Sequence, residues 1–124
     1  MELKVRVVES RSFSKTVYLE GKLNNETVGV LNEELAKIAG SSVSVVVFDL
    51  ADLEYISSVG LRSIFGTRKL MAARGGKAIL VNPRPQVQKV LDIVNAVDLT
   101  AVFTSTAELD RYLDTMQRKI VDGA

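Results

Sequence analysis

One stretch of the sequence, from Val43 to Leu50, is almost continuously apolar. A strand with one exposed face alternates apolar and polar residues, whereas a strand covered on both faces reads as an apolar run. The run therefore predicts a central strand that is covered on both faces. The four residues from Ala78 to Val81 predict a second buried strand. Strands of this kind require helices packed against the sheet.

Elsewhere, apolar residues recur at intervals of three and four, which is the spacing of one helix face. Four stripes show this spacing: Val28/Leu31/Leu35/Ile38, Leu61/Ile64/Phe65/Arg68/Met71–Ala72, Val87/Val90/Leu91/Val94 and Leu109/Tyr112/Leu113/Met116/Ile120. We expect all four to face inward, the first and third against a sheet centred on residues 45–48. Helix boundaries are expected at a cap on Asn24 or Asn25, at Gly40, at Gly75-Gly76, at Pro85 and at a capping box that begins with Ser105.

Two further segments, Leu3 to Val7 and Lys15 to Glu20, alternate apolar and polar residues and predict a hairpin. Gly21 is expected to end the second of these strands. Ala101 to Phe103 is short and apolar and is typical of an edge strand. Because strands alternate with helices and no repeat or linker interrupts them, we expect a single α/β domain over residues 1–124 with a parallel or mixed sheet.

The 124 residues contain no cysteine and no histidine. These absences exclude disulfides and thiolate chemistry and remove the commonest general base and metal ligand. A net charge of +1 argues against a nucleic-acid partner, and the longest apolar runs are too short for a membrane span. No secretion signal opens the chain. We therefore expect a cytoplasmic monomer that is not an enzyme and holds no metal or cofactor.

Two adjacent hydroxyls stand between the predicted central strand and the helix that follows it, within Tyr55-Ile56-Ser57-Ser58-Val59-Gly60-Leu61-Arg62. The first N–H groups of a helix have no partner within the helix, and the aligned peptide dipoles favour negative charge there. A serine at this point can cap the helix, and it can also carry a phosphate that the helix end suits.

Several short motifs occur in a fixed order around this junction. They are Gly21-Lys22-Leu23-Asn24, the apolar strand that closes with Asp49-Leu50, the predicted loop Ala51–Glu54, the junction itself, Gly75-Gly76-Lys77, Pro85-x-Val87-x-x-Val90-Leu91 and Leu99-x-x-Val102-Phe103. From about Leu3 to Leu113 this order resembles the STAS domain, in particular the bacterial anti-sigma factor antagonists. The resemblance implies a mixed sheet of four to five strands with about four helices packed on it, a core of residues 3–113 and a frayed tail over residues 122–124.

The resemblance also implies a function. Unphosphorylated antagonists of this kind bind an anti-sigma factor that is also a serine kinase. The kinase phosphorylates the antagonist and releases it, and a separate serine phosphatase reverses the change. The same fold also serves as an interaction subunit in ABC lipid-transport and sensory complexes without a phosphorylation cycle, which remains the alternative.

The phosphoacceptor of the antagonists stands two residues before the Gly-Leu pair, which is Ser58 here. Family members usually carry Asp at the position of Ser57 and often at that of Asn24, so two acidic positions are neutral in this chain. Ser57 is thus an alternative acceptor. Ser58 is expected at the first turn of the helix with its hydroxyl exposed, and the implied partner-binding residues are Asn24, Ser57, Ser58, Val59, Gly60 and Arg62.

Each of these residues also has a structural interpretation. Gly60 is either a close-approach point for a partner or an ordinary glycine near a helix end. Arg62 is either an exposed arginine or a cation that pairs with a phosphoserine or an acidic partner. The acidic residues Asp49, Asp52 and Glu54 are expected in a solvated loop. The basic residues of the following helix, Arg62, Arg68, Lys69 and Arg74, are expected on a solvated face or a protein interface.

Overall fold

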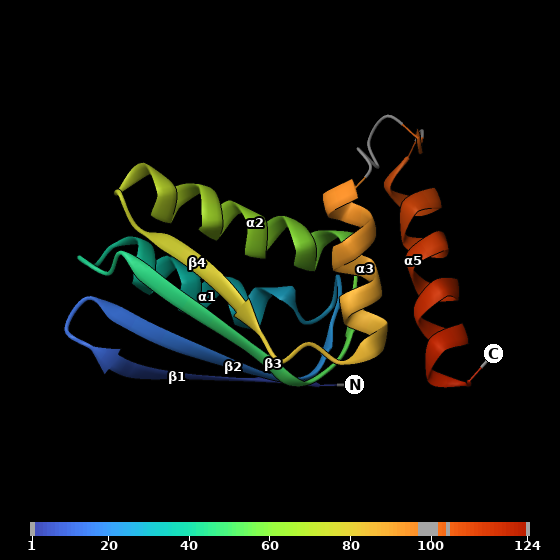
Figure 1. The fold of residues 1–124 in the computed structure, drawn as a ribbon, viewed down its shortest axis with the longest axis horizontal. Helices are drawn as coiled ribbons and strands as arrows, with labels where there is room; N and C mark the ends of the chain where they lie inside the picture. The colour runs from blue at the N-terminus through green and yellow to red at the C-terminus, as the bar shows by residue number, and fades with distance from the viewer. Residues whose placement is uncertain (1, 97–101, 104, 124) are drawn as a thin grey trace.

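A computed structural model shows the fold and describes residues 2–96, 102–103 and 105–123 (Figure 1). Along the chain lie β1 (Leu3–Arg11), β2 (Ser14–Leu23), α1 (Val28–Ala39), β3 (Val45–Ile56), α2 (Ser58–Ala73), β4 (Lys77–Val81), α3 (Pro85–Ala96) and α5 (Thr106–Val121). The strands form one sheet in the order β1-β2-β3-β4. Helices pack on this sheet, so the predicted α/β class is confirmed.

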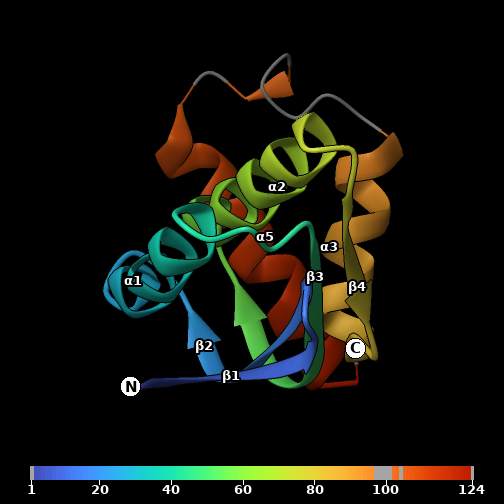
Figure 2. The same ribbon diagram turned by 90° about the vertical axis from the view of Figure 1, so that its left-hand side faces the viewer.

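The sheet is mixed because its first pair is a hairpin and the other pairs are parallel. Strand β1 runs antiparallel to β2, with Leu3 opposite Gly21 and Arg11 opposite Ser14. Strands β2, β3 and β4 run parallel to one another. Figure 2 shows the sheet curving around α1 and α2. Helices α3 and α5 lie side by side at the end of the sheet where β2 and β3 finish and α2 starts (Figures 1 and 2).

Strand β3 is fully covered on one face only. Its side chains Val46, Phe48 and Leu50 are buried, whereas the alternate residues Val45 and Val47 are half-buried. The prediction of cover on both faces is therefore wrong for the second face. Helices α1 and α2 cover the first face (Figure 2), and on the second face β1 and β2 supply polar side chains, such as the Arg6 guanidinium over the Tyr18 ring.

Strands β2 and β3 both run further than the sequence predicts. Gly21 does not end β2, which continues to Leu23; its φ of +110° and the backbone oxygen of Glu2, 2.2 Å from where a Cβ would lie, leave room for glycine alone. The stretch Ala51–Glu54, predicted as a loop, belongs to β3, which ends at Ile56. The reason is pairing with β2, which is maintained through two register shifts.

The basic residues of α2 divide into two groups. Arg62, Arg68 and Lys69 are exposed, as expected of a solvated face. Arg74, at the C-cap of α2, instead donates to the carbonyl oxygens of Ser41 and Val43, at 3.1 Å and 2.8 Å, and to those at the end of α1. A cation suits the free carbonyls at a helix C-terminus. Arg74 is exposed like the other three, and it also holds α1 and α2 together, a role that the sequence does not predict.

The predicted apolar stripes largely form the core. Leu31 and Ile38 of α1 are buried and Leu35 is half-buried against the core, while Val87, Val90 and Leu91 of α3 are buried. Three predicted stripe residues are exposed instead, namely Arg68 and Ala72 of α2 and Tyr112 of α5, which is 40% exposed. The predicted edge strand does not form over its described part, since Val102 is helical and Phe103 is in neither state; Ala101 lies outside the described residues. Each described helix is too short or too polar to cross a bilayer.

Candidate functional site

The junction of Tyr55–Arg62 is fixed by the sheet on one side and by α2 on the other. Ser57 is the N-cap of α2, with an extended backbone, and its N–H donates to the Leu23 carbonyl at 2.9 Å. The Ser57 carbonyl in turn accepts from Leu61 at 3.0 Å, which is the first hydrogen bond of the helix. Ser58 is the first residue of α2, as the sequence predicts. The end of the β2–β3 pair thus places both serines at a helix N-terminus.

Both serine hydroxyls are buried and lack a partner. Ser57 and Ser58 are 3% and 7% exposed, and within the described residues neither Oγ atom has a hydrogen-bond partner. The predicted exposed hydroxyl of Ser58 is therefore wrong, and Ser57 makes no side-chain cap hydrogen bond. A buried hydroxyl without a partner costs roughly 1–3 kcal/mol. Native structures contain few such groups, so the two serines are an unusual feature of this junction.

Helix α5 supplies the group that caps α2. The Oδ1 atom of Asp110 accepts the Ser58 backbone N–H at 2.9 Å, across 52 residues of sequence. A carboxylate at this point satisfies one of the free N–H groups and complements the dipole of α2. Asp110 therefore takes the capping role that the sequence assigns to a serine. Sequence reasoning missed Asp110, since a single acid on a predicted amphipathic helix carries no local signal of this contact.

A second side chain of α5 binds the end of β3. The amide of Gln117, 1% exposed, accepts the Ile56 N–H at 3.0 Å and donates to the Ile56 carbonyl at 2.8 Å. Strand β4 is short and pairs with β3 only as far as Asp49, so the rest of that edge has no strand beside it. Gln117 thus takes the place of a neighbouring strand at Ile56.

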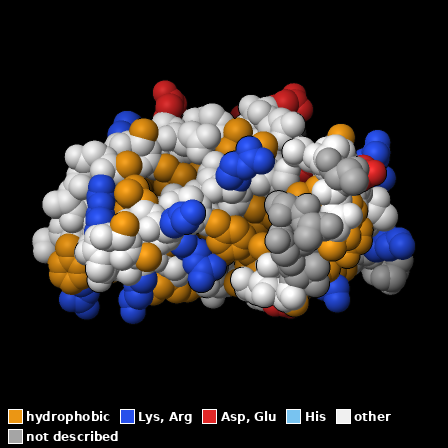
Figure 3. Space-filling view, turned by 90° about the horizontal axis from the view of Figure 1, so that it is seen from above, with side chains coloured by type: hydrophobic (Ala, Val, Ile, Leu, Met, Phe, Trp, Pro, Cys, Tyr) orange, Lys and Arg blue, Asp and Glu red, His pale blue; other side chains and the backbone are white. Residues whose placement is uncertain are grey.

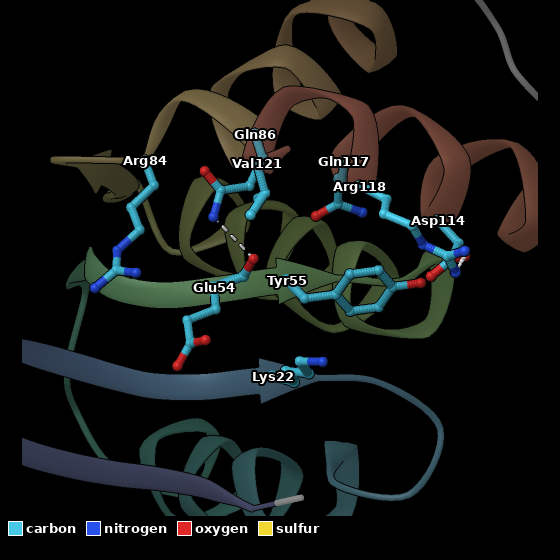
Figure 4. Close-up of a pocket in the computed structure, with 9 residues that line it drawn as sticks. All are labelled: Lys22, Glu54, Tyr55, Arg84, Gln86, Asp114, Gln117, Arg118 and Val121. Atoms are coloured by element: carbon cyan, nitrogen blue, oxygen red, sulfur yellow. Dashed lines mark hydrogen bonds and ion pairs between the residues drawn. The ribbon is translucent and has the colours of Figure 1, made fainter. Parts of the chain in front are cut away.

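The loop and helix that follow β4 also donate hydrogen bonds to this edge of β3. Arg84 Nε donates to the Ala51 carbonyl at 2.9 Å, and Gln86 Nε2 donates to the Glu54 carbonyl at 3.0 Å (Figure 4). These side chains explain how β3 extends beyond its pairing with β4. They also hold the start of α3 beside the last part of β3.

Two adjoining pockets lie between α5 and the sheet end. The first, of about 290 Å³, is lined by Lys22, Glu54, Tyr55, Arg84, Gln86, Asp114, Gln117, Arg118 and Val121 (Figure 4). The second, of about 310 Å³, is lined by Lys22, Asn24, Asn25, Glu26, Tyr55, Ser57, Asp110 and Asp114. Burial raises the pKa of Tyr55, and the carboxylates of Asp114 and Asp110 raise it further. The surroundings of the junction therefore disfavour additional negative charge.

Asn24 lies at the second pocket, together with Ser57. Its Oδ1 atom accepts the N–H groups of Glu26 and Thr27, at 2.9 Å and 3.1 Å. The N-cap of α1 is Thr27, so the prediction of Asn24 or Asn25 as the cap is off by two or three residues. Asn24 closes the turn before the helix instead. The structure brings Asn24 close to Ser57 while giving it a structural role.

Gly60, Val59 and Arg62 occupy different environments. A Cβ on Gly60 would lie 2.6 Å from Cγ of Leu23, so packing within the chain requires glycine there. Val59 is half-buried. Arg62 is exposed and, among the described residues, has no hydrogen bond or ion pair. The structure thus supports the structural interpretation of Gly60 and leaves Arg62 free to bind another molecule.

The face seen from above carries basic side chains that are separated by apolar and uncharged ones (Figure 3). Arg68 packs its guanidinium 5.4 Å from the centre of the Phe65 ring. Over the described part of the chain, no group of three or more acidic residues is arranged to hold a metal ion.

Comparisons with known proteins identify the family of this chain. Residues 4–109 match the family model of the STAS domain. The chain is 32% identical over 87 residues to a Bordetella bronchiseptica protein named as anti-sigma factor antagonist BtrV, which covers 70% of this chain and 75% of the relative. It is 28% identical over 108 residues to the anti-sigma F factor antagonist of Lysinibacillus sphaericus, with 86% and 88% covered.

The fold also superposes on two solved structures of one antagonist. The unphosphorylated form of the anti-sigma factor antagonist SpoIIAA superposes with a TM-score of 0.66 at 21% identity, covering 72% of this chain and 78% of that one. Its phosphorylated form superposes with a TM-score of 0.63 at 20% identity, with 72% and 81% covered. The chain belongs to the STAS domain family, among the relatives of the anti-sigma factor antagonists.

Proposed function

We propose that this chain is an anti-sigma factor antagonist that acts as a phosphorylation-controlled switch and not as an enzyme. The observation that carries the proposal is Ser58 as the first residue of α2, directly before Val59-Gly60-Leu61. That is the position which the family resemblance assigns to the phosphoacceptor. The names of the curated relatives and the two phosphorylation states of SpoIIAA support the proposal.

In the proposed cycle the unphosphorylated chain binds an anti-sigma factor in the bacterial cytoplasm and so frees a sigma factor. The anti-sigma factor is also a serine kinase, which uses ATP and Mg²⁺ to phosphorylate Ser58. A separate serine phosphatase removes the phosphate. The chain itself contributes a hydroxyl, a binding surface and no catalysis.

The physical basis of the switch is the charge of the phosphate. A phosphoserine carries nearly two negative charges at neutral pH. The N-terminus of α2 and the exposed Arg62 one turn later favour these charges within the chain. In a packed interface the same charges must lose their water, and any facing carboxylate repels them. Phosphorylation can therefore abolish a complex without unfolding the sheet.

The proposed partner surface surrounds Ser58. It comprises Asn24, Ser57, Val59, Gly60 and Arg62, of which Arg62 is the most exposed. If Arg62 contacts the partner, Arg62→Ala should weaken the complex of the unphosphorylated chain. If it pairs with phosphoserine, the same change should lower the thermal stability of the phosphorylated chain more than that of the free chain.

The test combines capture and site mapping. The immobilised chain is exposed to lysate of the source organism, and bound proteins are identified by mass spectrometry before and after ATP is added. We expect a kinase-type ATPase that is released by ATP, with one phosphate at Ser58. Ser58→Ala should stay bound, Ser58→Asp should bind poorly, and Ser57→Ala should behave as the unchanged chain.

Other results would redirect the assignment. Phosphate mapped to Ser57 would move the site by one residue. A Ser58→Asp chain that binds as well as the unchanged chain would remove the switch. Capture of a transporter ATPase without phosphorylation would instead favour the interaction subunit of an ABC lipid-transport complex.

A further inference from the structure

Ser58 is closed to an enzyme in the arrangement that the structure shows. Its Oγ atom is inaccessible to solvent and has no hydrogen-bond partner among the described residues. A kinase must place the attacking hydroxyl in line with the γ-phosphate of ATP, which requires the oxygen to leave the protein surface. Burial of Ser58 and transfer of a phosphate to it are therefore two different states of this molecule.

Helix α5 lies against the site and places a negative charge there. The Asp110 carboxylate lies on the Ser58 N–H, at the N-terminus of α2. That position is where a phosphate on Ser58 would find its own hydrogen-bond donors. The carboxylate and the phosphate therefore compete for one anion position, because like charges in contact repel strongly when they are partly buried.

The charges around the position do not offset this repulsion. From the elements beside it come the acids Glu26, Asp110 and Asp114 and the phenol of Tyr55, against the cations Lys22 and Arg118. Arg118 is already paired with Asp114. Arg62, on α2 itself, is exposed. Three acids thus stand against three cations, so the surroundings offer no excess of positive charge to a phosphate at the position that Asp110 already holds.

The attachment of α5 is suited to release. Two of its sixteen residues, Leu113 and Gln117, are buried, and Gln117 and Asp110 hold it to the junction through backbone groups of Ile56 and Ser58. Water can take over each of those hydrogen bonds when the helix leaves. Elements with few buried apolar contacts are the ones that open locally.

We propose that α5 is a built-in cover of the switch site, an inference that rests on the proposed function of Ser58. The cover leaves the junction before Ser58 accepts a phosphate. Once the phosphate is present, its charge against Asp110 keeps α5 from returning. The chain then differs between its two states in the position of a helix as well as in charge, and a partner can distinguish the states by either feature.

Access to the site can be measured without any partner. Because the chain has no cysteine, Ser58→Cys provides a single thiol whose alkylation by iodoacetamide reports exposure at position 58. Adding Asp110→Ala and Gln117→Ala should speed alkylation by about tenfold or more, since the rate follows the open fraction. Arg111→Ala, an exposed position on α5, is the matched control and should leave the rate unchanged.

The effect of the phosphate can also be measured directly. Phosphoserine is encoded at position 58 during translation, and hydrogen exchange is followed across α5 and α3. We expect exchange in α5 to rise by about tenfold or more while that in α3 is unchanged. Asp110→Asn keeps an oxygen for the Ser58 N–H but removes the charge, and it should suppress most of the rise.

The proposal that α5 covers the site is wrong if the alkylation rate is unchanged after both α5 substitutions. It is also wrong if hydrogen exchange in α5 is equal with and without phosphoserine. Both experiments are independent of the kinase. If α5 opens as expected but no captured partner phosphorylates the chain, the cover is supported and the proposed function is wrong. If Ser58 is phosphorylated and α5 does not move, the proposed function is supported and the cover is wrong.

Discussion

Helices α3 and α5 lie side by side at the same end of the sheet, yet they are attached in different ways (Figure 1). Helix α3 has twelve residues and buries Gln86, Val87, Val90 and Leu91. Helix α5 has sixteen residues and buries Leu113 and Gln117. The shorter helix therefore buries more of its residues, whereas the longer one buries two and packs Leu109 and Met116, partly buried, against the core.

The difference shows how one small domain combines a fixed and a removable element. Apolar burial stabilises α3 in proportion to the area removed from water. Polar contacts stabilise α5 at the junction, and such contacts contribute a small net free energy because water competes for the same groups. Function at the junction can therefore act on α5 without disturbing α3 or the sheet.

The sharpest test of this difference removes a buried leucine from each helix. Leu91→Ala should lower the free energy of unfolding by about 2–5 kcal/mol, because it leaves a cavity in the core. Leu113→Ala should cost less, although Leu113 is 0% exposed, because α5 can separate while the rest stays folded. Urea unfolding followed by circular dichroism measures both. Equal losses would make α5 an integral part of the core and break the comparison.

A smaller effect is expected from the amide that holds α5. Gln117→Ala leaves the Ile56 N–H and carbonyl without their partner, and should cost about 1–3 kcal/mol of the free energy that keeps α5 docked. Hydrogen exchange at Ile56 and along α5 measures the loss. Gln86→Ala, which removes one comparable hydrogen bond to Glu54 from α3, is the control and should leave exchange in α5 unchanged.

Removing the buried Ser57 hydroxyl should not lower the free energy of unfolding, in contrast to the two leucine substitutions above. If Ser57 capped α2, Ser57→Ala would lower stability by about 0.5–2 kcal/mol. Since its Oγ has no partner in the described part of the chain, the substitution should instead be neutral or raise the unfolding free energy by up to about 1 kcal/mol. Thermal unfolding distinguishes the two signs. A clear loss of stability would show that the hydroxyl does bind a partner.

The smallest effect concerns pH. Burial, together with Asp114 and Asp110, raises the pKa of Tyr55 in the folded chain. The neutral phenol thus favours folding at all pH values below the ordinary tyrosine pKa, and this contribution is lost as pH rises from there through the raised value. The melting temperature should therefore fall more for the unchanged chain than for Tyr55→Phe between about pH 9 and pH 11. Equal falls in melting temperature would show that the Tyr55 phenol is exposed to solvent and does not lie against α5.

The architecture could be predicted where a pattern repeats. Stripes such as Leu31/Ile38 and Val87/Val90/Leu91 report one helix face, because burial selects apolar residues at the helical period. Element ends were predicted less well. Asp52 and Glu54 suggested a loop, yet they lie in β3, because pairing with β2 and side chains from α3 satisfy the backbone there.

The site, too, has a part that could be predicted from the sequence and a part that could not. Ser58 at the start of α2 follows from local order, since a strand, two hydroxyls and a Gly-Leu pair stand within eight residues. The contact of α5 with the junction does not follow from local order. Asp110 binds Ser58 across 52 residues of sequence, and Gln117 binds Ile56 across 61. Contacts between distant residues leave no periodic trace in the sequence.

By itself the sequence determined the α/β class, the helix faces and the position of Ser58 at the start of α2, because each depends on the spacing of neighbouring residues. Only the tertiary structure decided that both hydroxyls are buried, that a carboxylate of α5 rather than a serine caps α2, and that Gln117 completes the edge of β3. Burial and capping are properties of what packs against a residue. At this junction the packing partner is the last helix of the chain.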